Sequence, residues 1–436
     1  MKHAHLPSLL AASLLFASAA TAMAQAPASL EKVHDNATVT TVLEEADLVS
    51  QFGGTYLDGL DLAVMSDGNI IFVGNGASSK TAIYHLDVTT GSVTRVVNTL
   101  QIQQAAGYAI GGSKWIDIDG VNVDLAGNIY ILLHGWDWML QGPAELSVLR
   151  VPLSGAAPGG FGAPVQLFNK PHGIFGEIAM DMDVFGTLHL VVDDGELAGD
   201  AGAAMVPNGI YTMLLGTTVP APLATYASIA PNLSGGGPDL TGVISSHEDI
   251  GAGNIAAGLF KTYVTMGDTA GSALSWDTTT GEVHDGDIVE IDQLTGQSKV
   301  LISKQRYLEV SNTLFHKGRP MRTNIRDISL LVDIQRNRLY TWENDYASHG
   351  SYRHLSLLQW DLTTGAYEQL ILNHAQAVLP WLQDGADPLG GGFTIYNLAP
   401  RGNVMSLAPD GSILVYLQAY LADGGDRILR ITPTDL

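Results

Sequence analysis

The sequence predicts an all-β protein folded as a six-bladed β-propeller, and three observations lead to that fold class. A unit of two apolar strands joined by a tight turn recurs along the chain, a D-x-x-T-G turn recurs with it, and the last unit lacks a fourth strand. The 436 residues include 49 glycines and no cysteine, so stability must come from packing and ring closure rather than from disulfides.

The recurring unit is an apolar strand, a tight turn and a second apolar strand. Clear copies have their turns at 66–69, 126–128, 185–186, 336–337 and 409–411. The glycines Gly68, Gly127 and Gly186 are evenly spaced, and the step from Gly186 to Asn337 is wide enough for two units. We therefore expect a further unit at 254–266, with a poorly formed turn near 258–261.

Each unit continues through a third strand, a second turn and a fourth strand. The second turn reads D-x-x-T-G at 87–91, 292–296 and 361–365. In such a hairpin the Asp side chain caps the loop backbone and the Gly adopts a positive φ. Looser versions occur at 146–168 and 209–226. Four antiparallel strands per unit and six units are the pattern of a β-propeller.

The last unit indicates how the ring closes. Its third strand, at 427–432, runs almost to the final residue, whereas the segment 37–43 near the N-terminus resembles the fourth strands of other units. We expect 37–43 to complete the last blade, which removes exposed sheet edges. Two β-sandwiches and a seven-bladed ring are the alternatives, the second because the fourth unit is ill-defined.

The first residues have the pattern of an export signal. Lys2 precedes a short apolar stretch, and Ala22-Met23-Ala24 forms an A-x-A cleavage site. The sequence thus predicts a signal peptide at 1–24 and a single propeller domain at 25–436, in the periplasm or secreted. The alternative is an uncleaved anchor helix, but the stretch is short for a bilayer span, and no later segment is long and apolar enough.

The excess of acidic residues limits the kinds of molecule that the protein is expected to bind. Lys and Arg number 21 against 44 Asp and Glu, a formal net charge of −23. An acidic surface repels phosphate backbones and anionic lipids, so we expect no nucleic-acid partner and no membrane docking. A small neutral or basic molecule or a cation is the expected partner, and the oligomeric state is left open.

The longer connections are all expected on one face of the ring, where binding and catalysis usually occur, although such loops can also merely shield the mouth. Polar residues recur there at the end of each second strand: Asn75, His134, Asp193, Asp268, Asn344 and Gln418. Others lie just before the first strands: Asp58, Asp119, Glu177, Glu248, Asp327 and Asn403.

A ring of carboxylates around an axis is costly unless some are protonated or a hard cation lies among them. Oxygen ligands without cysteine favour Ca²⁺ or Mg²⁺, and Ca²⁺ is the expected ion. The predicted metal ligands are Glu177, Asp193, Glu248, Asp268, Asp327 and Asn344. The alternative is a solvated acidic mouth that holds no fixed ion.

Two histidines are predicted as catalytic general bases, because His134 and His247 fall at the level of the polar ring and imidazole titrates near neutral pH. His85 and His189 lie within strands and are expected to be packed or hydrogen-bonded. The tryptophans of the long connections either stack on a ligand or pack the loops onto the blades.

The blade pattern also supports a family resemblance. The segments 66–73, S-D-G-N-I-I-F-V, and 408–415, A-P-D-G-S-I-L-V, resemble the six-bladed superfamily of the SMP-30/gluconolactonase, paraoxonase-like and NHL-repeat propellers. This resemblance implies an axial Ca²⁺ and hydrolysis of lactones or esters, with Glu177, Asp268 and Asn344 as matching ligands. The chain is richer in Asp and Glu where those enzymes have Asn.

Two functions follow from these patterns. The first is a divalent-cation-assisted hydrolase, or a lyase, acting on a small neutral ester, lactone or sugar-like substrate at the loop-rich face. The second is a non-catalytic propeller of the periplasm that binds a ligand or a protein.

Overall fold

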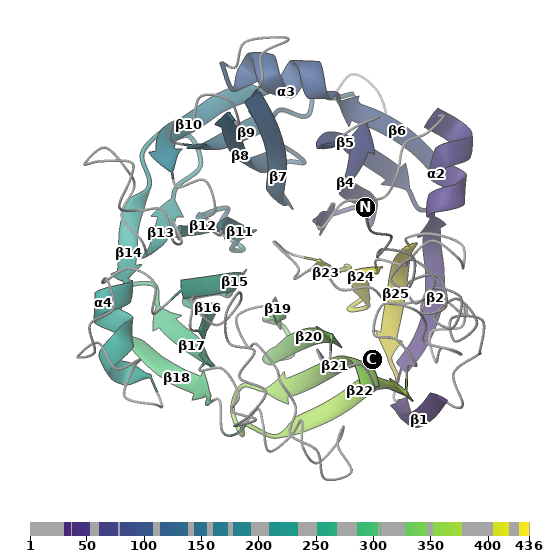
Figure 1. Ribbon diagram of the computed structural model, residues 1–436, viewed down its shortest axis with the longest axis vertical. Helices are drawn as coiled ribbons and strands as arrows, with labels where there is room; N and C mark the ends of the chain where they lie inside the picture. Colours follow the sequence, from purple (N-terminus) through teal and green to yellow (C-terminus); the bar gives the residue numbers. More distant parts are fainter. Residues whose placement is uncertain are drawn as a thin grey trace, which may run out of the picture.

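The described strands form six antiparallel sheets around a common axis, as Figure 1 shows for the computed structural model of this chain. The predicted six-bladed β-propeller is confirmed, and the sandwich and seven-bladed alternatives are not. The structure describes residues 30–35, 37–52, 61–76, 79–107, 114–137, 144–154, 160–172, 178–192, 209–233, 251–267, 286–303, 306, 328–346, 352–376, 404–417 and 427–435.

The first three blades each contain four consecutive strands. Blade one comprises β3 (Leu62–Val64), β4 (Ile70–Gly76), β5 (Ser79–Asp87) and β6 (Ser92–Val97). Blade two comprises β7 (Lys114–Val123), β8 (Ile129–Asp137), β9 (Ala144–Val151) and β10 (Val165–His172). Blade three comprises β11 (Ile178–Met182), β12 (Leu188–Val192), β13 (Gly209–Met213) and β14 (Ala221–Thr225).

The remaining blades include the one that the sequence defined poorly. Blade four comprises β15 (Gly251–Ala257), β16 (Lys261–Gly267), β17 (Gly286–Asp292) and β18 (Ser298–Ile302). Blade five contains β19 (Ser329–Asp333), β20 (Arg338–Tyr346), β21 (Tyr352–Asp361) and β22 (Tyr367–Gln376). Blade six contains β23 (Met405–Leu407), β24 (Ile413–Leu417) and β25 (Arg427–Pro433).

The ring closes through the N-terminal strand, as predicted. The strand β2 (Ala37–Glu44) pairs antiparallel with β25 from Ala37 opposite Pro433 to Glu44 opposite Arg427, and so supplies the fourth strand of blade six. The N-terminal strand β2 and the last strand β25 therefore share one sheet, so the outer edge of β25 is covered.

Several elements at the rim were not predicted. The strand β1 (Leu30–Asp35) adds a fifth, outer strand to blade five by pairing with β22. The helices α2 (Glu45–Phe52), α3 (Thr99–Ala105) and α4 (Tyr226–Ile229), the last followed by the 3-10 turn η2 (Ala230–Asn232), lie at the periphery in Figure 1. None of the helices in the described part of the chain is long and apolar enough to cross a bilayer.

The hydrophobic core lies between the blades rather than in one central mass. Five clusters of buried residues each join neighbouring sheets, for example Ile71 and Ile83 of blade one with Ile131 of blade two. Strands near the axis are apolar on both sides because both sheet faces are covered. This explains why the first and second strands read as continuous apolar runs rather than alternating ones.

The predicted D-x-x-T-G turns form as expected. Asp87, Asp292 and Asp361 each accept backbone N–H groups two and three residues ahead, and the Gly N–H donates to the Asp carbonyl at 2.8 Å in all three. Gly91, Gly296 and Gly365 have φ values of 70°, 69° and 68°, which is the left-handed region that glycine enters without steric cost.

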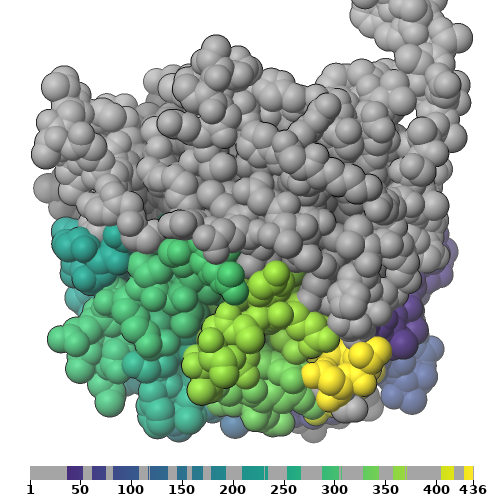
Figure 2. Space-filling model, turned by 90° about the horizontal axis from the view of Figure 1, so that it is seen from below, coloured from purple at the N-terminus to yellow at the C-terminus, as the bar shows by residue number. Residues whose placement is uncertain are grey.

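All of these tight turns lie on one face of the ring, which we call the turn face. The first-to-second and third-to-fourth turns alternate with longer connections at the opposite strand ends, so the described residues gather on one side of the disc (Figure 2).

Candidate functional site

Most of the predicted metal ligands lie outside the described residues. These are Glu177, Asp193, Glu248, Asp268 and Asp327, together with the predicted base His247. Their roles therefore stay predictions. The strands next to these residues in the sequence are described, so the positions of the adjoining strand ends are known.

Several predicted ligands are adjacent in the sequence to residues that pair with each other at the ends of neighbouring strands. Ile178, which follows Glu177, pairs with Val192, which precedes Asp193. In blade four Gly267, which precedes Asp268, pairs with Gly251 at the start of the innermost strand. These pairs are the last of their ladders at the end away from the turn face.

Asn344, which was expected at the end of the second strand of blade five, lies within that strand. The strand β20 continues to Tyr346, and Asn344 pairs with Leu355 of β21. The second strand of blade five is thus longer than the apolar run indicated, because backbone pairing with β21 continues to Tyr346. The backbone of Asn344 thus lies toward the end of blade five that is away from the turn face, which is compatible with its predicted role as a metal ligand.

His134 also lies within a strand. β8 continues to Asp137, and His134 pairs with Asp117 on one side and with Leu146 on the other. Its side chain is only 3% exposed. A general-base role for this imidazole therefore requires that a substrate reach an almost fully buried side chain.

Buried polar side chains also occur on the innermost strands or directly before them, at a similar distance from the turn face. Asp61 and Asn254 lie three residues before the last first-strand residue that pairs across the turn of blades one and four, and Ser329 lies four residues before it in blade five. Asp119 lies in a bulge of β7. All four are at most 4% exposed. Asp119 was expected before its strand, but β7 begins at Lys114 and carries it inside the ladder.

Two of these side chains have polar atoms without a hydrogen-bond partner in the structure. Both amide atoms of Asn254 and the hydroxyl of Ser329 are of this kind. The backbone N–H of Asn254 instead donates to the Thr265 hydroxyl at 2.8 Å, because the bulge in β15 turns it from the ladder. Burying unpaired polar groups costs free energy, so such positions often hold a water molecule, an ion or a ligand.

The donor set on these strands fits a hard cation. Carboxylate, amide and hydroxyl oxygens are the ligands of Ca²⁺ and Mg²⁺, and cysteine is absent from the sequence. Within the described ranges, no three His, Asp or Glu side chains come together as a metal-binding group. A complete coordination sphere therefore requires residues from the loop side, where the predicted ligands lie in the sequence.

A second polar cluster links blades three and four at the turn face. The ring of His189 is flanked by Thr262 Oγ1, 2.9 Å from Nδ1, and by Asp183 Oδ2, 3.3 Å from Nε2. Gln293 donates to the same Thr262 hydroxyl at 3.4 Å. This order of groups is that of a nucleophile, base and acid, but Thr262 is fully buried, so no substrate reaches its hydroxyl. The cluster is structural, as expected for a strand histidine.

The carboxyl of Asp181 lies beside this cluster and joins the same two blades. Its Oδ2 accepts the backbone N–H of Ala257, on the innermost strand of blade four, at 2.7 Å. Burial raises the pKa of Asp181 to about 6, against the hydrogen bonds from Ala257 and Met182 that favour the charged form.

Equivalent links occur at two other blade junctions. Asn122 donates to the Met180 carbonyl of blade three, and the Ser406 hydroxyl accepts the Val64 N–H of blade one. Asn122, Asp181 and Ser406 each precede their turn glycine by five residues, so one register position repeatedly connects innermost strands. These links between blades were not predicted, although three polar residues at one register position were a visible signal in the sequence.

Comparison with known proteins gives similarity at the level of the fold. No family profile matches the chain, and no curated protein matches it. An oligogalacturonate lyase in complex with manganese is 10% identical with a TM-score of 0.40, covering 94% of this chain and 98% of the other. A Penicillium chrysogenum α-L-arabinanase complexed with arabinobiose is 9% identical with a TM-score of 0.44, covering 91% and 98%.

A third solved structure is similar to the same extent. The Nup133 β-propeller domain of Vanderwaltozyma polyspora is 10% identical with a TM-score of 0.40, covering 93% of this chain and 99% of its own. Such similarities specify neither a substrate nor a reaction, because one fold hosts many chemistries.

Proposed function

We propose that the protein is a divalent-cation-assisted hydrolase or lyase acting on a small neutral ester, lactone or sugar-like substrate. The observation that carries the proposal is the set of buried oxygen donors near one level of the innermost strands, with the unpaired amide of Asn254 among them. Converging polar groups in a largely apolar wall are typical of a small-molecule site.

The ion would be held by oxygen ligands at the loop end of the strands. The residues we assign to it are Glu177, Asp193, Glu248, Asp268, Asp327 and Asn344. A divalent cation, with Ca²⁺ expected, supplies Lewis acidity toward a carbonyl or glycosidic oxygen when bound. The acidic ligands also restrict the substrate, because a net charge of −23 disfavours anionic molecules.

The chain itself would move the proton. His134 and His247 are the proposed general bases, and the burial of His134 on β8 limits its exchange with bulk water. An apolar wall of neighbouring strands excludes solvent from that level, which strengthens electrostatic interactions there. We further propose export after removal of residues 1–24, with action in the periplasm or outside the cell.

The test is metal content measured together with activity. Purified protein is analysed for bound metals, and its melting temperature is followed with and without a chelator and after Ca²⁺ is restored. The variants Glu177→Gln and Asp268→Asn are expected to lose bound metal, the Ca²⁺-dependent rise in melting temperature and hydrolysis of a lactone and ester panel. Asp67→Asn removes one charge at an exposed turn-face position and should retain all three properties.

Two results would contradict the proposal. One is native protein without a divalent ion whose melting temperature does not respond to Ca²⁺ or chelator. The other is unchanged metal content in both ligand variants. A protein that passes the metal test but hydrolyses nothing in the panel would support the non-catalytic alternative instead.

A further inference from the structure

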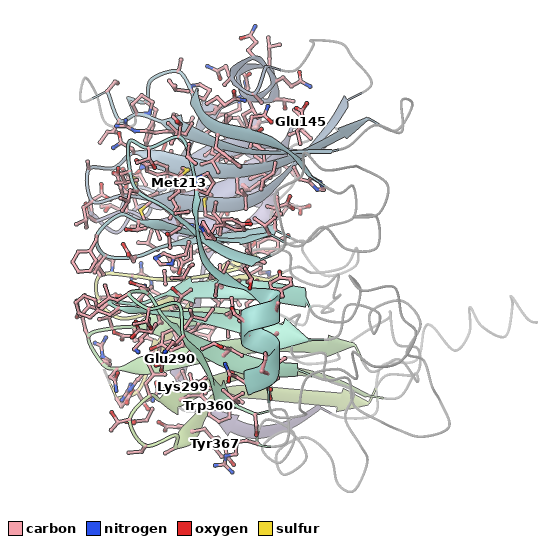
Figure 3. The ribbon with its side chains drawn as sticks, turned by 90° about the vertical axis from the view of Figure 1, so that its left-hand side faces the viewer. Glu145, Met213, Glu290, Lys299, Trp360 and Tyr367 are labelled. Carbon is pink, nitrogen blue, oxygen red and sulfur yellow. The ribbon has the colours of Figure 1, made fainter. Side chains whose placement is uncertain are left out.

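The turn face of blades three and four carries a cluster of exposed apolar side chains. Leu294 is 84% exposed, Phe185 63% and Phe260 51%. The full cluster, which we call the turn-face patch, consists of Val184, Phe185, Leu214, Leu215, Val219, Leu259, Phe260 and Leu294. Figure 3 shows this side of the molecule at its left edge, with Met213 and Glu290 labelled on blades three and four.

Contacts between turns connect blades three and four within the patch. The rings of Phe185 in blade three and Phe260 in blade four have centroids 6.0 Å apart. The backbone N–H of Gln293 donates to the Phe260 carbonyl at 3.1 Å, which joins the turn of Leu294 to the same surface. Leu215 lies against Gly186, the residue after Phe185, so both turns of blade three also meet.

The same turns in blades one, five and six are polar at these positions, whereas blade two has Ala126. Phe185 directly precedes its turn glycine, where blades one and six have Asp67 and Asp410. Leu294 occupies the third position of its D-x-x-T-G turn, where blades one and five have Thr89 and Thr363. Polar residues are therefore compatible with the geometry of these turns. The geometry alone does not explain why blades three and four have apolar residues there.

The charged groups around the patch are already paired. Asp183 contacts His189, Asp292 contacts Lys261 at 2.9 Å, and Glu290 contacts both Lys261 and Lys299. Glu290 and Lys299 lie together near this face in Figure 3. On a protein of net charge −23, Lys261 and Lys299 offset the carboxylates of Glu290 and Asp292 beside the patch.

We propose that the turn-face patch is the interface of a symmetric dimer formed by two copies of this chain. Eight exposed side chains of these types amount to on the order of 800 Å², which is the area that each partner contributes to a standard interface and exceeds the usual patch on a monomer. Two like-charged molecules associate best where their carboxylates are neutralised, and one patch facing itself needs no other partner.

Two other occupants fit less well. A lipid surface would accept exposed Leu and Phe side chains, but binding of this kind is reinforced by cations, and the chain carries a large acidic excess. A different protein would be expected to show charge complementarity, whereas the charges of this patch are internally satisfied. Both occupants are distinguished by the experiment below.

The test is sedimentation equilibrium of the full chain across a concentration and salt series. We expect twice the monomer mass, with association strengthened by salt because salt screens the overall repulsion. The double variant Phe185→Asp, Leu294→Thr, which installs residues found in equivalent turns, should weaken the dimer at least about tenfold, as for loss of central interface residues. The control Leu100→Gln, on α3 and also exposed, should dimerise like the parent.

A second measurement guards against misfolding of the double variant. The chain has no cysteine, so Leu294→Cys and Leu100→Cys each provide a single thiol for a short bismaleimide cross-linker. The first is expected to yield a cross-linked dimer and the second only monomer. A monomeric parent at all concentrations would overturn the proposal, as would a dimer that persists in the folded double variant. Binding of a monomeric parent to phosphatidylcholine vesicles or to a basic protein would assign the patch to that partner instead.

Discussion

A single carboxyl at the junction of blades three and four has an unusual proton affinity. Burial raises the pKa of Asp181 to about 6 from 3.8. The facing groups are Asp183, whose charge raises this pKa further, and His189, which lowers it, together with the N–H groups of Ala257 and Met182. A carboxyl with a raised pKa stabilises the fold fully below pH 3.8 and loses that contribution as the pH rises through 6.

Replacing Asp181 by Asn should therefore stabilise the protein at neutral pH. The amide stays uncharged and still offers an oxygen to the Ala257 N–H, so we expect a gain of about 1–2 kcal/mol at pH 7 after allowing for solvent screening. The gain should shrink toward zero near pH 4. Urea unfolding of both proteins at a series of pH values measures it.

The neighbouring carboxyl provides a control of opposite sign. Burial raises the pKa of Asp183, but hydrogen bonds from His189 and from backbone N–H groups outweigh that effect and hold it below its usual value. Asp183→Asn should therefore destabilise the protein at neutral pH, and the loss should fade as the pH falls. Parallel pH profiles for the two variants would contradict both assignments.

At the scale of the element, the sequence predicted turns correctly where the residues that stabilise a turn lie within that turn. The D-x-x-T-G turns were predicted because the Asp and Gly roles are fulfilled within five residues. The strand β1 was missed because its segment, L-E-K-V-H-D, carries no strong apolar pattern and forms only by pairing with β22, more than 300 residues away. Likewise Asp119 was displaced by a bulge that no sequence rule located.

The two N-terminal strands should differ sharply in importance. A chain that begins at Ala37 lacks β1 but keeps the closing strand β2, and it should fold with a modest loss of stability. A chain that begins at Glu45 lacks β2 as well and leaves both the β25 edge and Leu43 exposed. We expect this second chain to aggregate or to melt well below the first.

Circular dichroism melts and gel filtration of the two truncated chains check this prediction. Equal melting temperatures would mean that blade six is stable with three strands. A larger loss from removing β1 than from removing β2 would show that the outer strand, rather than closure, supports the ring.

At the scale of the whole molecule, the two faces of the disc are expected to act independently. The predicted metal ligands adjoin one set of strand ends, and the turn-face patch occupies the other. Effects at distant sites without shared partners usually add. Phe185→Asp with Leu294→Thr should alter self-association while leaving bound metal and substrate turnover unchanged within experimental error.

The reverse variants complete this test. Glu177→Gln and Asp268→Asn should change metal content and leave the association constant unaltered. The two assays are elemental analysis and sedimentation of the same samples. Coupled changes in both would mean that blade packing transmits strain through the ring, which a rigid propeller does not predict.

The sequence by itself determined the blade count, the closing strand and the turn chemistry, because apolar runs, turn residues and chain ends are local or repeating patterns. Only the tertiary structure decided which buried polar side chains are left without a hydrogen-bond partner, such as Asn254 and Ser329, and which exposed turns meet, such as those of Phe185 and Phe260. These features depend on strand register, bulges and the rotation between blades, which arise from packing between segments far apart in the chain.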